Sequence, residues 1–291
     1  MDGQITSRVP FDVYRDIDAL NMSRLKEIER SPKRFVWRAT HPLVTKPLTL
    51  GKAAHCAVLE PERFDQDFVI WDKLTKNGSG NIAPRSGEQW EKFKAENVGK
   101  SIITVEERNF AMAMQAAVRA DPVAMKYLEV GDPEVTMEWD LSESWGLPPR
   151  RCKARADWLT RMEDQRYVIG LKTAMDCREF AFGAAAARYG YALQWAWYHD
   201  GYRTITGIAP RMKEIVVESA PPHEVMVYNV TEDILLEGRD RYLELLKILG
   251  ECETSGKWPG PGGDTEHDLT LPTWYYGQQD DLNELGLEAA A

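Results

Sequence analysis

The sequence predicts an α/β protein, and three observations support this class. Its 291 residues, 43% hydrophobic and 28% charged, suffice for one large α/β domain or two small ones with a sizeable core. Residues 151–173 have the pattern of two strands joined by a polar turn. Helical patterns stand on both sides of this pair, among them residues 49–64 and 179–202.

The predicted strand pair carries the most informative polar residues of the chain. One face of its first strand, which alternates with small or apolar residues, holds Arg151, Lys153, Arg155 and Asp157. In the second strand, residues 167–173, Gly170 and Lys172 share a face. Antiparallel pairing across the turn would therefore place Asp157 near both Gly170 and Lys172.

Two helices are predicted ahead of this pair. The first runs over residues 21–30, with Ser23 as a candidate cap, and Pro32 ends it. The second lies in the stretch 49–64, begins near Thr49 and ends before Pro61. Small residues allow the second helix to pack closely, which leaves His55 as its conspicuous polar side chain. A histidine in this setting is commonly a core residue with satisfied hydrogen bonds, so a ligand role needs further support.

Between residues 65 and 141 the sequence carries less chemical information. The predicted elements are a Gly/Ser/Asn-rich loop over 73–87, helices over 88–96 and 106–127, and a strand over 132–140. Spacing puts two acids, Glu134 and Glu138, on the same face of that strand.

The part after residue 173 is predicted to alternate helices and strands. The helices cover 179–188, 189–202 and 231–249, the last ending at Gly250, and two strands cover 214–218 and 224–228. On the second of these helices Gln194 and Tyr198 are four residues apart, so they project from one face. We expect one domain over residues 1–270 and a loosely held C-terminal extension over 271–291.

Charge and cysteine usage limit the partners and the location of the chain. A net charge of −10 means that any contact with DNA must come from a local basic groove. No apolar run reaches the length of a membrane span, and the polar N-terminus lacks the apolar segment of a signal peptide. The four cysteines show no CxxC spacing. These features predict a cytoplasmic protein without membrane contact.

Asp157 on one strand, followed by X-X-Lys172 on the next, resembles the core of the PD-(D/E)XK nuclease superfamily. The resemblance implies a central mixed β-sheet flanked by helices. In that superfamily an acid-X-Lys motif follows the first Asp, and two carboxylates hold Mg²⁺. Here Gly170 stands where the family has its second acid. This departure predicts a turnover reduced by orders of magnitude, with fold and DNA binding largely kept.

Other motifs, within roughly residues 15–245, resemble RecE-type exonucleases (exodeoxyribonuclease VIII-like). LGKAAHCAVLEPERF around His55 is similar to the LGxxxHxxxLEPexF motif of RecE-like and RecB-like nucleases. GYALQWAWYHDGY around Gln194 and Tyr198 is similar to GYxxQxxxYxxGY. Residues 16–38 resemble the family's opening helix, and Glu134 best matches a family glutamate of the active site, with Glu138 as the alternative.

The resemblance implies a division of labour among these residues. Mg²⁺, with Mn²⁺ as a substitute, would be held by Asp157, the Leu171 carbonyl, Glu134 and His55. Lys172 would orient or deprotonate the attacking water, and Gln194 with Tyr198 would position the lysine and the phosphate. Arg151, Lys153 and Arg155 would guide the DNA backbone, although a solvated strand face explains them equally well.

The implied activity is a 5′ to 3′ exonuclease that degrades linear double-stranded DNA and leaves 3′ single strands for recombination. A RecT-type annealing protein and a homo-oligomeric ring are the implied partners. Gly170 makes this chain inactive or nearly so in this interpretation, and we favour a deliberately inactivated variant over a natural divergent member. The alternatives are a non-catalytic DNA-end-binding protein of the same fold and a RecB-like single-strand nuclease.

Overall fold

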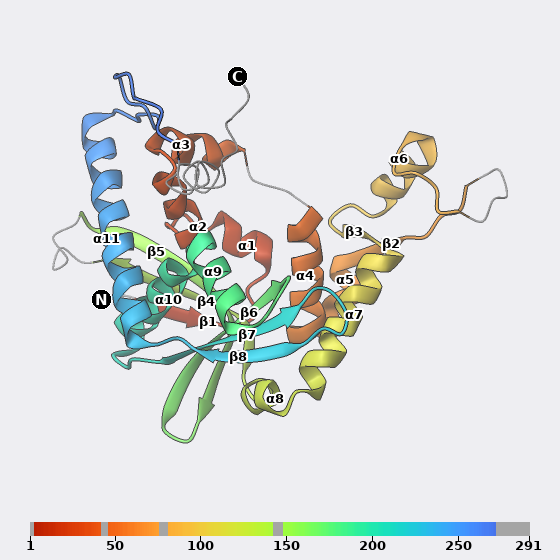
Figure 1. Cartoon of the computed structure of the whole chain (residues 1–291). Helices are drawn as coiled ribbons and strands as arrows, with labels where there is room; N and C mark the ends of the chain where they lie inside the picture. The colour runs from red at the N-terminus through yellow and green to blue at the C-terminus, as the bar shows by residue number, and fades with distance from the viewer. Residues whose placement is uncertain (1–2, 42–45, 76–80, 142–147, 272–291) are drawn as a thin grey trace, which may run out of the picture.

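The centre of the molecule is a six-stranded mixed sheet in the order β1-β4-β5-β6-β7-β8 (Figure 1). The computed structural model describes residues 3–41, 46–75, 81–141 and 148–271. The strands are β1 (Gln4–Thr6), β4 (Asp132–Leu141), β5 (Arg150–Met162), β6 (Gln165–Ala174), β7 (Arg211–Glu218) and β8 (Val225–Asn229). Among the described strands of this sheet, β6 and β7 are the parallel pair, since two helices connect them, and the expected mixed sheet is confirmed.

Helices cover both faces of this sheet, because each face carries apolar side chains that must be buried. One face packs against α2 (Met22–Leu25), α10 (Tyr191–Thr206) and α11 (Glu232–Ser255). The other face packs against α4 (Lys46–Leu59), α7 (Val105–Ala120) and α8 (Pro122–Leu128). The remaining helical segments are α1 (Phe11–Asp16), η1 (Lys26–Glu29), α3 (Pro32–Thr40), η2 (Pro61–Arg63), α5 (Phe64–Asp67), α6 (Gly87–Glu96) and α9 (Glu179–Tyr189).

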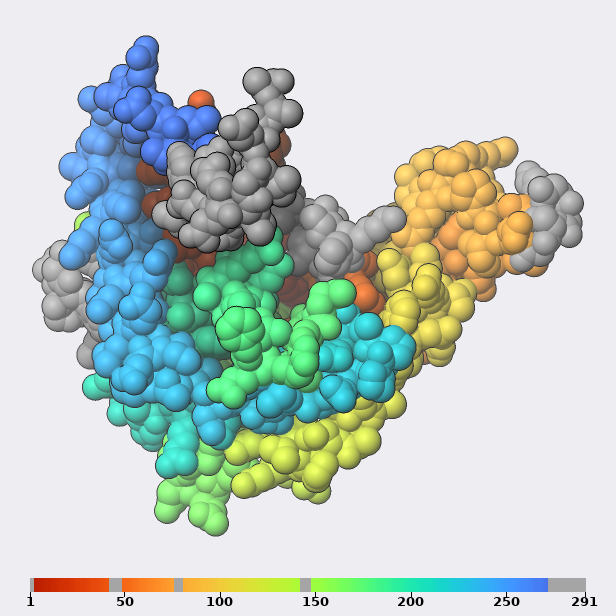
Figure 2. All heavy atoms as spheres, in the orientation of Figure 1, coloured from red at the N-terminus to blue at the C-terminus, as the bar shows by residue number. Residues whose placement is uncertain are grey.

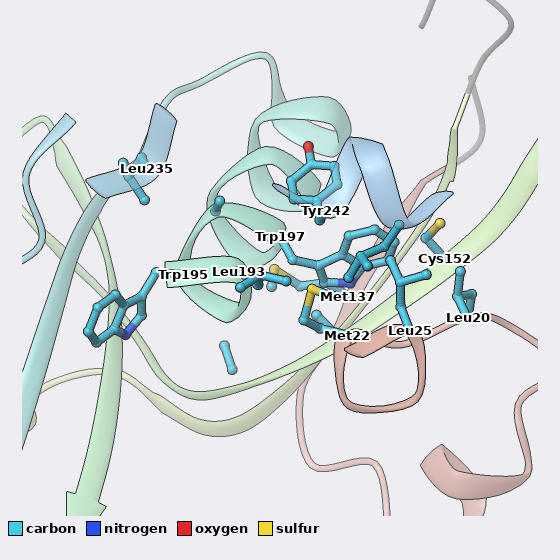
Figure 3. Packing of buried hydrophobic residues seen from close by; sticks show 14 of the residues in the cluster. Leu20, Met22, Leu25, Met137, Cys152, Leu193, Trp195, Trp197, Leu235 and Tyr242 are labelled. Carbon is cyan, nitrogen blue, oxygen red and sulfur yellow. The ribbon is translucent and has the colours of Figure 1, made fainter. Parts of the chain in front are cut away.

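The core around α10 shows how the helices are held on the first face (Figure 3). Trp197 of α10 packs edge-on against Tyr242 of α11, with ring centroids 5.3 Å apart. The Trp197 indole also donates a hydrogen bond to the carbonyl of Lys153, at 3.1 Å. Gly238 lets α11 approach closely, because a Cβ at this position would lie 2.1 Å from the carbonyl oxygen of Ala192. These contacts fix α10, and therefore Tyr198, relative to β5.

The strand pairing opens the sheet at one place. β5 and β6 pair from the hairpin turn only as far as Trp158 and Ile169. Beyond that pair, β5 continues along β4 and β6 continues along β7. Asp157 is the next residue of β5 after this last pair, so the two strands separate there. We call this point the fork, and the polar side chains of the hairpin gather at it.

A smaller unit stands out from the body of the molecule around α6 (Figure 2). It consists of β2 (Phe68–Trp71) and β3 (Ser101–Thr104), which pair in parallel, together with α6. Trp71, Ala83 and Phe93 form its buried core. Part of the predicted 73–87 loop belongs here, since Leu74 bridges to Ile82, while residues 76–80 lie outside the described residues.

One predicted helix cap and two predicted helix boundaries are wrong. Residues 21–30 form α2 and the short 3₁₀ segment η1, capped by the Asn21 side chain rather than Ser23, and Pro32 begins α3 instead of only ending a helix. The predicted helix over 106–127 breaks at Asp121, whose carboxylate caps α8. α11 continues past Gly250 because this glycine is buried within the helix, and Gly256 ends it in the left-handed conformation.

The predicted domain limits stay a prediction. The extension over 271–291 lies almost wholly outside the described residues. Within the described part of the chain, no helix is long and apolar enough to cross a bilayer.

Candidate active site

A cleft of about 1030 Å³ opens at the fork between β5 and β6. Its lining includes Tyr14, His55, Glu134, Asp157, Lys172 and Tyr198, which come from α1, α4, β4, β5, β6 and α10. The cleft reaches the smaller unit at Phe68 and Ser101. The fold therefore brings together most of the side chains predicted to form the site, although His55 and Tyr198 are 143 positions apart in the sequence.

Three of these residues form a set that fits a metal ion. His55, Glu134 and Asp157 each offer a ligand atom, and these atoms all lie within 4.8 Å of one another. A cation that keeps about 2.1 Å to each ligand needs separations of at most about 4.2 Å, so a small contraction completes the site. Carboxylate oxygens suit Mg²⁺ and Mn²⁺, and an imidazole nitrogen suits transition metals.

Asp157 lies at the centre of this set. Its Oδ2 accepts a hydrogen bond from the Leu171 amide at 2.8 Å, and its Oδ1 lies 3.9 Å from Nδ1 of His55. The Leu171 carbonyl accepts a hydrogen bond from Lys172 Nζ at 3.4 Å. Because the separated strand leaves this part of the Leu171 backbone beside the carboxylate, the predicted carbonyl ligand also lies at the site.

Glu134 lies beside Asp157 because its neighbours Pro133 and Val135 pair with the neighbours of Asp157. Its backbone has a φ of 50°, a left-handed conformation that costs about 1–3 kcal/mol in a residue other than glycine. Burial, together with the charge of Asp157, raises the pKa of Glu134 to about 7. Arg155 Nε donates a hydrogen bond to the carboxylate and favours its charged form.

Of the two candidate acids on β4, Glu134 lies in the cleft and Glu138 does not. Glu138 is 7% exposed and accepts hydrogen bonds from Gln4 at 2.7 Å and Arg151 at 3.1 Å. It does not line the cleft, whereas Glu134 does. The left-handed turn of the backbone at Glu134 interrupts the alternation on which the predicted shared face depended.

The surroundings of His55 favour its neutral imidazole form. Burial lowers its pKa from the ordinary value, although the Asp157 carboxylate opposes this effect. The neutral form keeps a lone pair free to bind a metal ion. The predicted ligand role of His55 is thus consistent with its position on α4, one-quarter exposed and facing Asp157.

Lys172 lies between two carboxylates. Its Nζ is 3.7 Å from Oδ2 of Asp157 and 3.3 Å from Oε1 of Glu214, and its side chain is 15% exposed. Burial opposes the charged form, but Glu214 and Asp157 outweigh it and raise the pKa of Lys172 above its ordinary value. Of the two roles predicted for this lysine, the geometry favours orienting water or phosphate as an ammonium over removing a proton.

Gln194 and Tyr198 interact with each other as their spacing on one helix face requires. Gln194 Nε2 donates a hydrogen bond to the Tyr198 hydroxyl at 3.1 Å. Tyr198 lines the cleft, and burial raises its pKa to about 12, so the phenol keeps its proton. Gln194 is not among the described residues that line the cleft, and its hydrogen bond to Tyr198 connects it to the lining.

The predicted DNA-binding role of the basic row on β5, formed by Arg151, Lys153 and Arg155, needs correction, because the N-terminal segment covers part of this row. Lys153 is 3% exposed, and its three donors bond to the carbonyl oxygens of Tyr14, Arg15 and Ile17 at 2.7–3.0 Å. Lys153 is therefore not available to a DNA phosphate.

The two arginines of the row also have internal partners. Arg151 pairs with Glu138 and Asp140, at 3.1 and 3.6 Å. Arg155 bonds to Glu134 and to the carbonyl of Val9, and of the three cations it is the one in the cleft lining. The sequence could not show this pairing, because β4 and the segment before α1 supply the partners.

Glu214 was not predicted to belong to the site. It is fully buried on β7, directly opposite Gly170 in the parallel pair of strands. The Trp195 indole donates a hydrogen bond to its Oε2, and Lys172 is its cationic neighbour. The available signal was an acid directly before the apolar run 215–217, since a strand buried on both faces rarely carries an unpaired acid.

No curated protein matches the chain. A solved structure from Eubacterium rectale, named as a candidate exonuclease, shares 13% identity and a TM-score of 0.61, over 94% of this chain and 98% of that one. At this identity the likeness concerns the fold.

Two further solved structures match at 13% identity with scores too low to carry an argument. SSO0001 has a TM-score of 0.28 over 53% of this chain and 69% of that chain. Protein VC1899 from Vibrio cholerae has a TM-score of 0.24 over 86% of this chain and 58% of that chain. In contrast, a family model matches residues 21–267, which hold every residue of the site except Tyr14 and the rest of α1. The chain belongs to the family described as a PDDEXK-like domain of unknown function (DUF3799).

Proposed function

We propose that the chain is a nuclease that requires a divalent cation, Mg²⁺ or Mn²⁺, and digests linear double-stranded DNA from the 5′ end, in the manner of RecE-type exonucleases. The observation that carries the proposal is the convergence of His55, Glu134 and Asp157 within 4.8 Å, with Lys172 3.7 Å from Asp157. The family supports a nuclease. The metal, the DNA substrate and the polarity are part of the proposal.

The residues suit phosphodiester hydrolysis. A cation held by the two carboxylates and the imidazole would polarise the phosphate and lower the pKa of a bound water. The Nζ of Lys172 lies 3.7 Å from Oδ2 of Asp157, where it would orient that water or neutralise a phosphate oxygen. Tyr198 keeps its proton and offers a neutral hydrogen-bond donor in the same cleft.

A digestion assay tests this proposal. The purified chain is incubated with 5′-labelled linear duplex, single-stranded and circular DNA, with Mg²⁺, with Mn²⁺ or with a chelator. We expect the linear duplex alone to be degraded, only with a cation, and the 5′ label to be released first. Cleavage of single strands only would favour a RecB-like nuclease. Binding of duplex ends without cleavage would favour the end-binding protein and the inactivity predicted from Gly170.

The annealing partner and the ring are proposals that rest on the resemblance to RecE-type exonucleases. A homo-oligomer would appear in analytical ultracentrifugation of the chain, and linear DNA would stabilise it. Faster annealing of digested ends in the presence of a RecT-type protein would support the partner. A cytoplasmic location also stays a prediction.

Cation binding should release a proton from Glu134. Its pKa of about 7 means that the metal-free site carries most of one proton at pH 6 and little at pH 8.5. Since a ligand must be deprotonated, affinity should rise as pH increases through about 7. Calorimetry in two buffers of different ionisation enthalpy measures the released proton. Glu134→Gln should abolish the release, while Glu106→Gln on the exposed start of α7 should leave it unchanged.

A further inference from the structure

The space beside Gly170 is already filled by a carboxylate. A Cβ placed on Gly170 would lie 2.4 Å from both carboxylate oxygens of Glu214 and 2.7 Å from its Cδ. Contacts this short do not occur in packed proteins, so one of the two groups would have to move. An acidic side chain at 170 and Glu214 in its present position therefore exclude each other.

The two positions are also equivalent with respect to the site. Gly170 and Glu214 pair directly across β6 and β7, so their side chains point to the same face of the sheet. The oxygens of an aspartate at 170 would lie at a similar distance from that Cβ as the Glu214 oxygens do now. Either residue would thus place a carboxylate beside the Lys172 ammonium, whose Nζ is 3.3 Å from Glu214 Oε1.

A purely structural explanation of Glu214 is weak. The residue is fully buried, and its neighbours on β7 at positions 215, 216 and 217 are apolar. Among the described groups its Oε1 makes no hydrogen bond of good geometry, although Lys172 lies close. Replacing a buried ion pair by apolar residues is often neutral or stabilising, so stability alone does not call for this charge.

Two other acids lie close to position 170 in the sequence, Asp164 and Asp176. The Asp176 carboxylate accepts three hydrogen bonds from the guanidinium of Arg178, in the segment before α9. Asp164 is fully exposed in the hairpin turn and lies 3.6 Å from Arg161. Among the described residues neither acid forms an ion pair with Lys172, whereas Glu214 and Asp157 do.

We propose that Glu214 replaces the acid missing at position 170 and acts as the positioning residue that holds Lys172 toward Asp157. The inference rests on the proposed nuclease function and deepens it. Gly170 is then a requirement of the relocated carboxylate rather than a lesion. Glu214 then supplies the negative charge that the site lacks at position 170, so the glycine there does not lower turnover.

A cycle of variants tests the exchange, with cleavage of linear duplex DNA as the activity. Glu214→Gln keeps the volume and removes the charge, so we expect kcat to fall by roughly 10- to 100-fold with KM little changed. Glu214→Ala should lose at least as much. The double variant Gly170→Asp/Glu214→Ala should recover about tenfold over Glu214→Ala, because the new carboxylate has both the space and the position. Gly170→Asp alone should not raise activity and should lower the melting temperature.

Two features make the cycle decisive. Glu224→Gln, an exposed position on the other side of the β7–β8 turn, is the matched control and should keep full activity. Unchanged kcat in Glu214→Gln, or a double variant no better than Glu214→Ala, would overturn the proposal. If the unaltered chain digests no DNA with any cation, the proposed function fails. The melting temperatures then decide this inference: it is supported if the double variant is more stable than Gly170→Asp, and overturned if the two substitutions act independently.

Discussion

Replacing Asp157 by asparagine is expected to abolish cation-dependent cleavage of DNA, with a loss of about 10³-fold or more. The carboxylate is shared by the metal-binding set and by Lys172, so no other described group can supply its charge in the same place. A bound cation contributes several kcal/mol to transition-state stabilisation, and each 1.4 kcal/mol is a factor of ten in rate. Asparagine still accepts the hydrogen bond from the Leu171 amide, so the fold should survive.

Two measurements check this result. Digestion of linear duplex DNA gives the rate, and titration with Mn²⁺ followed by electron paramagnetic resonance gives cation binding, which should weaken together with the rate. Asp164→Asn in the exposed hairpin turn is the matched control and should change neither. Retained cation binding in Asp157→Asn would show that the metal site lies elsewhere.

Replacing Lys172 by methionine is expected to separate cation binding from turnover. Methionine has a similar length and no charge, so kcat should fall by about 10²- to 10⁴-fold. Cation binding should persist, because removing the ammonium leaves the negative charge of the site less compensated. Lys213→Met, on the adjacent strand and bonded to Asn229, is the matched control and should keep its activity.

The same substitution should alter stability in a pH-dependent way. Burial raises the pKa of Glu214 above its ordinary value, and loss of Lys172 removes the charge that opposes this shift. An acid with a raised pKa in the folded state destabilises that state as pH rises above its unfolded value of about 4.5. The deficit of Lys172→Met should therefore grow from pH 4.5 toward neutral pH, reaching about 3 kcal/mol. Urea unfolding at several pH values measures it, and a deficit independent of pH would contradict the placement of Glu214 beside Lys172.

The sequence predicted those parts of the fold that depend on local pattern. Alternation along β5 and β6 identified the hairpin and brought Asp157 to Gly170 and Lys172, because antiparallel pairing around a short turn fixes the register. Helical spacing related Gln194 to Tyr198 in the same way. The wrong helix boundaries occur where a proline or a buried glycine has two possible roles, as at Pro122 and Gly250, and packing chooses between them.

The contents of the site depended on partners that are distant in the chain. Lys153 looked available for DNA until α1 covered it, and its three donors are used by carbonyl groups more than 130 positions away. Glu214 was hidden for a similar reason, since the parallel neighbour of β6 is reached only through α9 and α10.

By itself, then, the sequence determined the strand pair, the identity of Asp157 and Lys172 and the absence of an acid at 170. Only the tertiary structure decided that the Glu214 carboxylate from β7 fills that place. Protein interiors are closely packed, so the space beside a glycine is filled by the residue that strand pairing places opposite it.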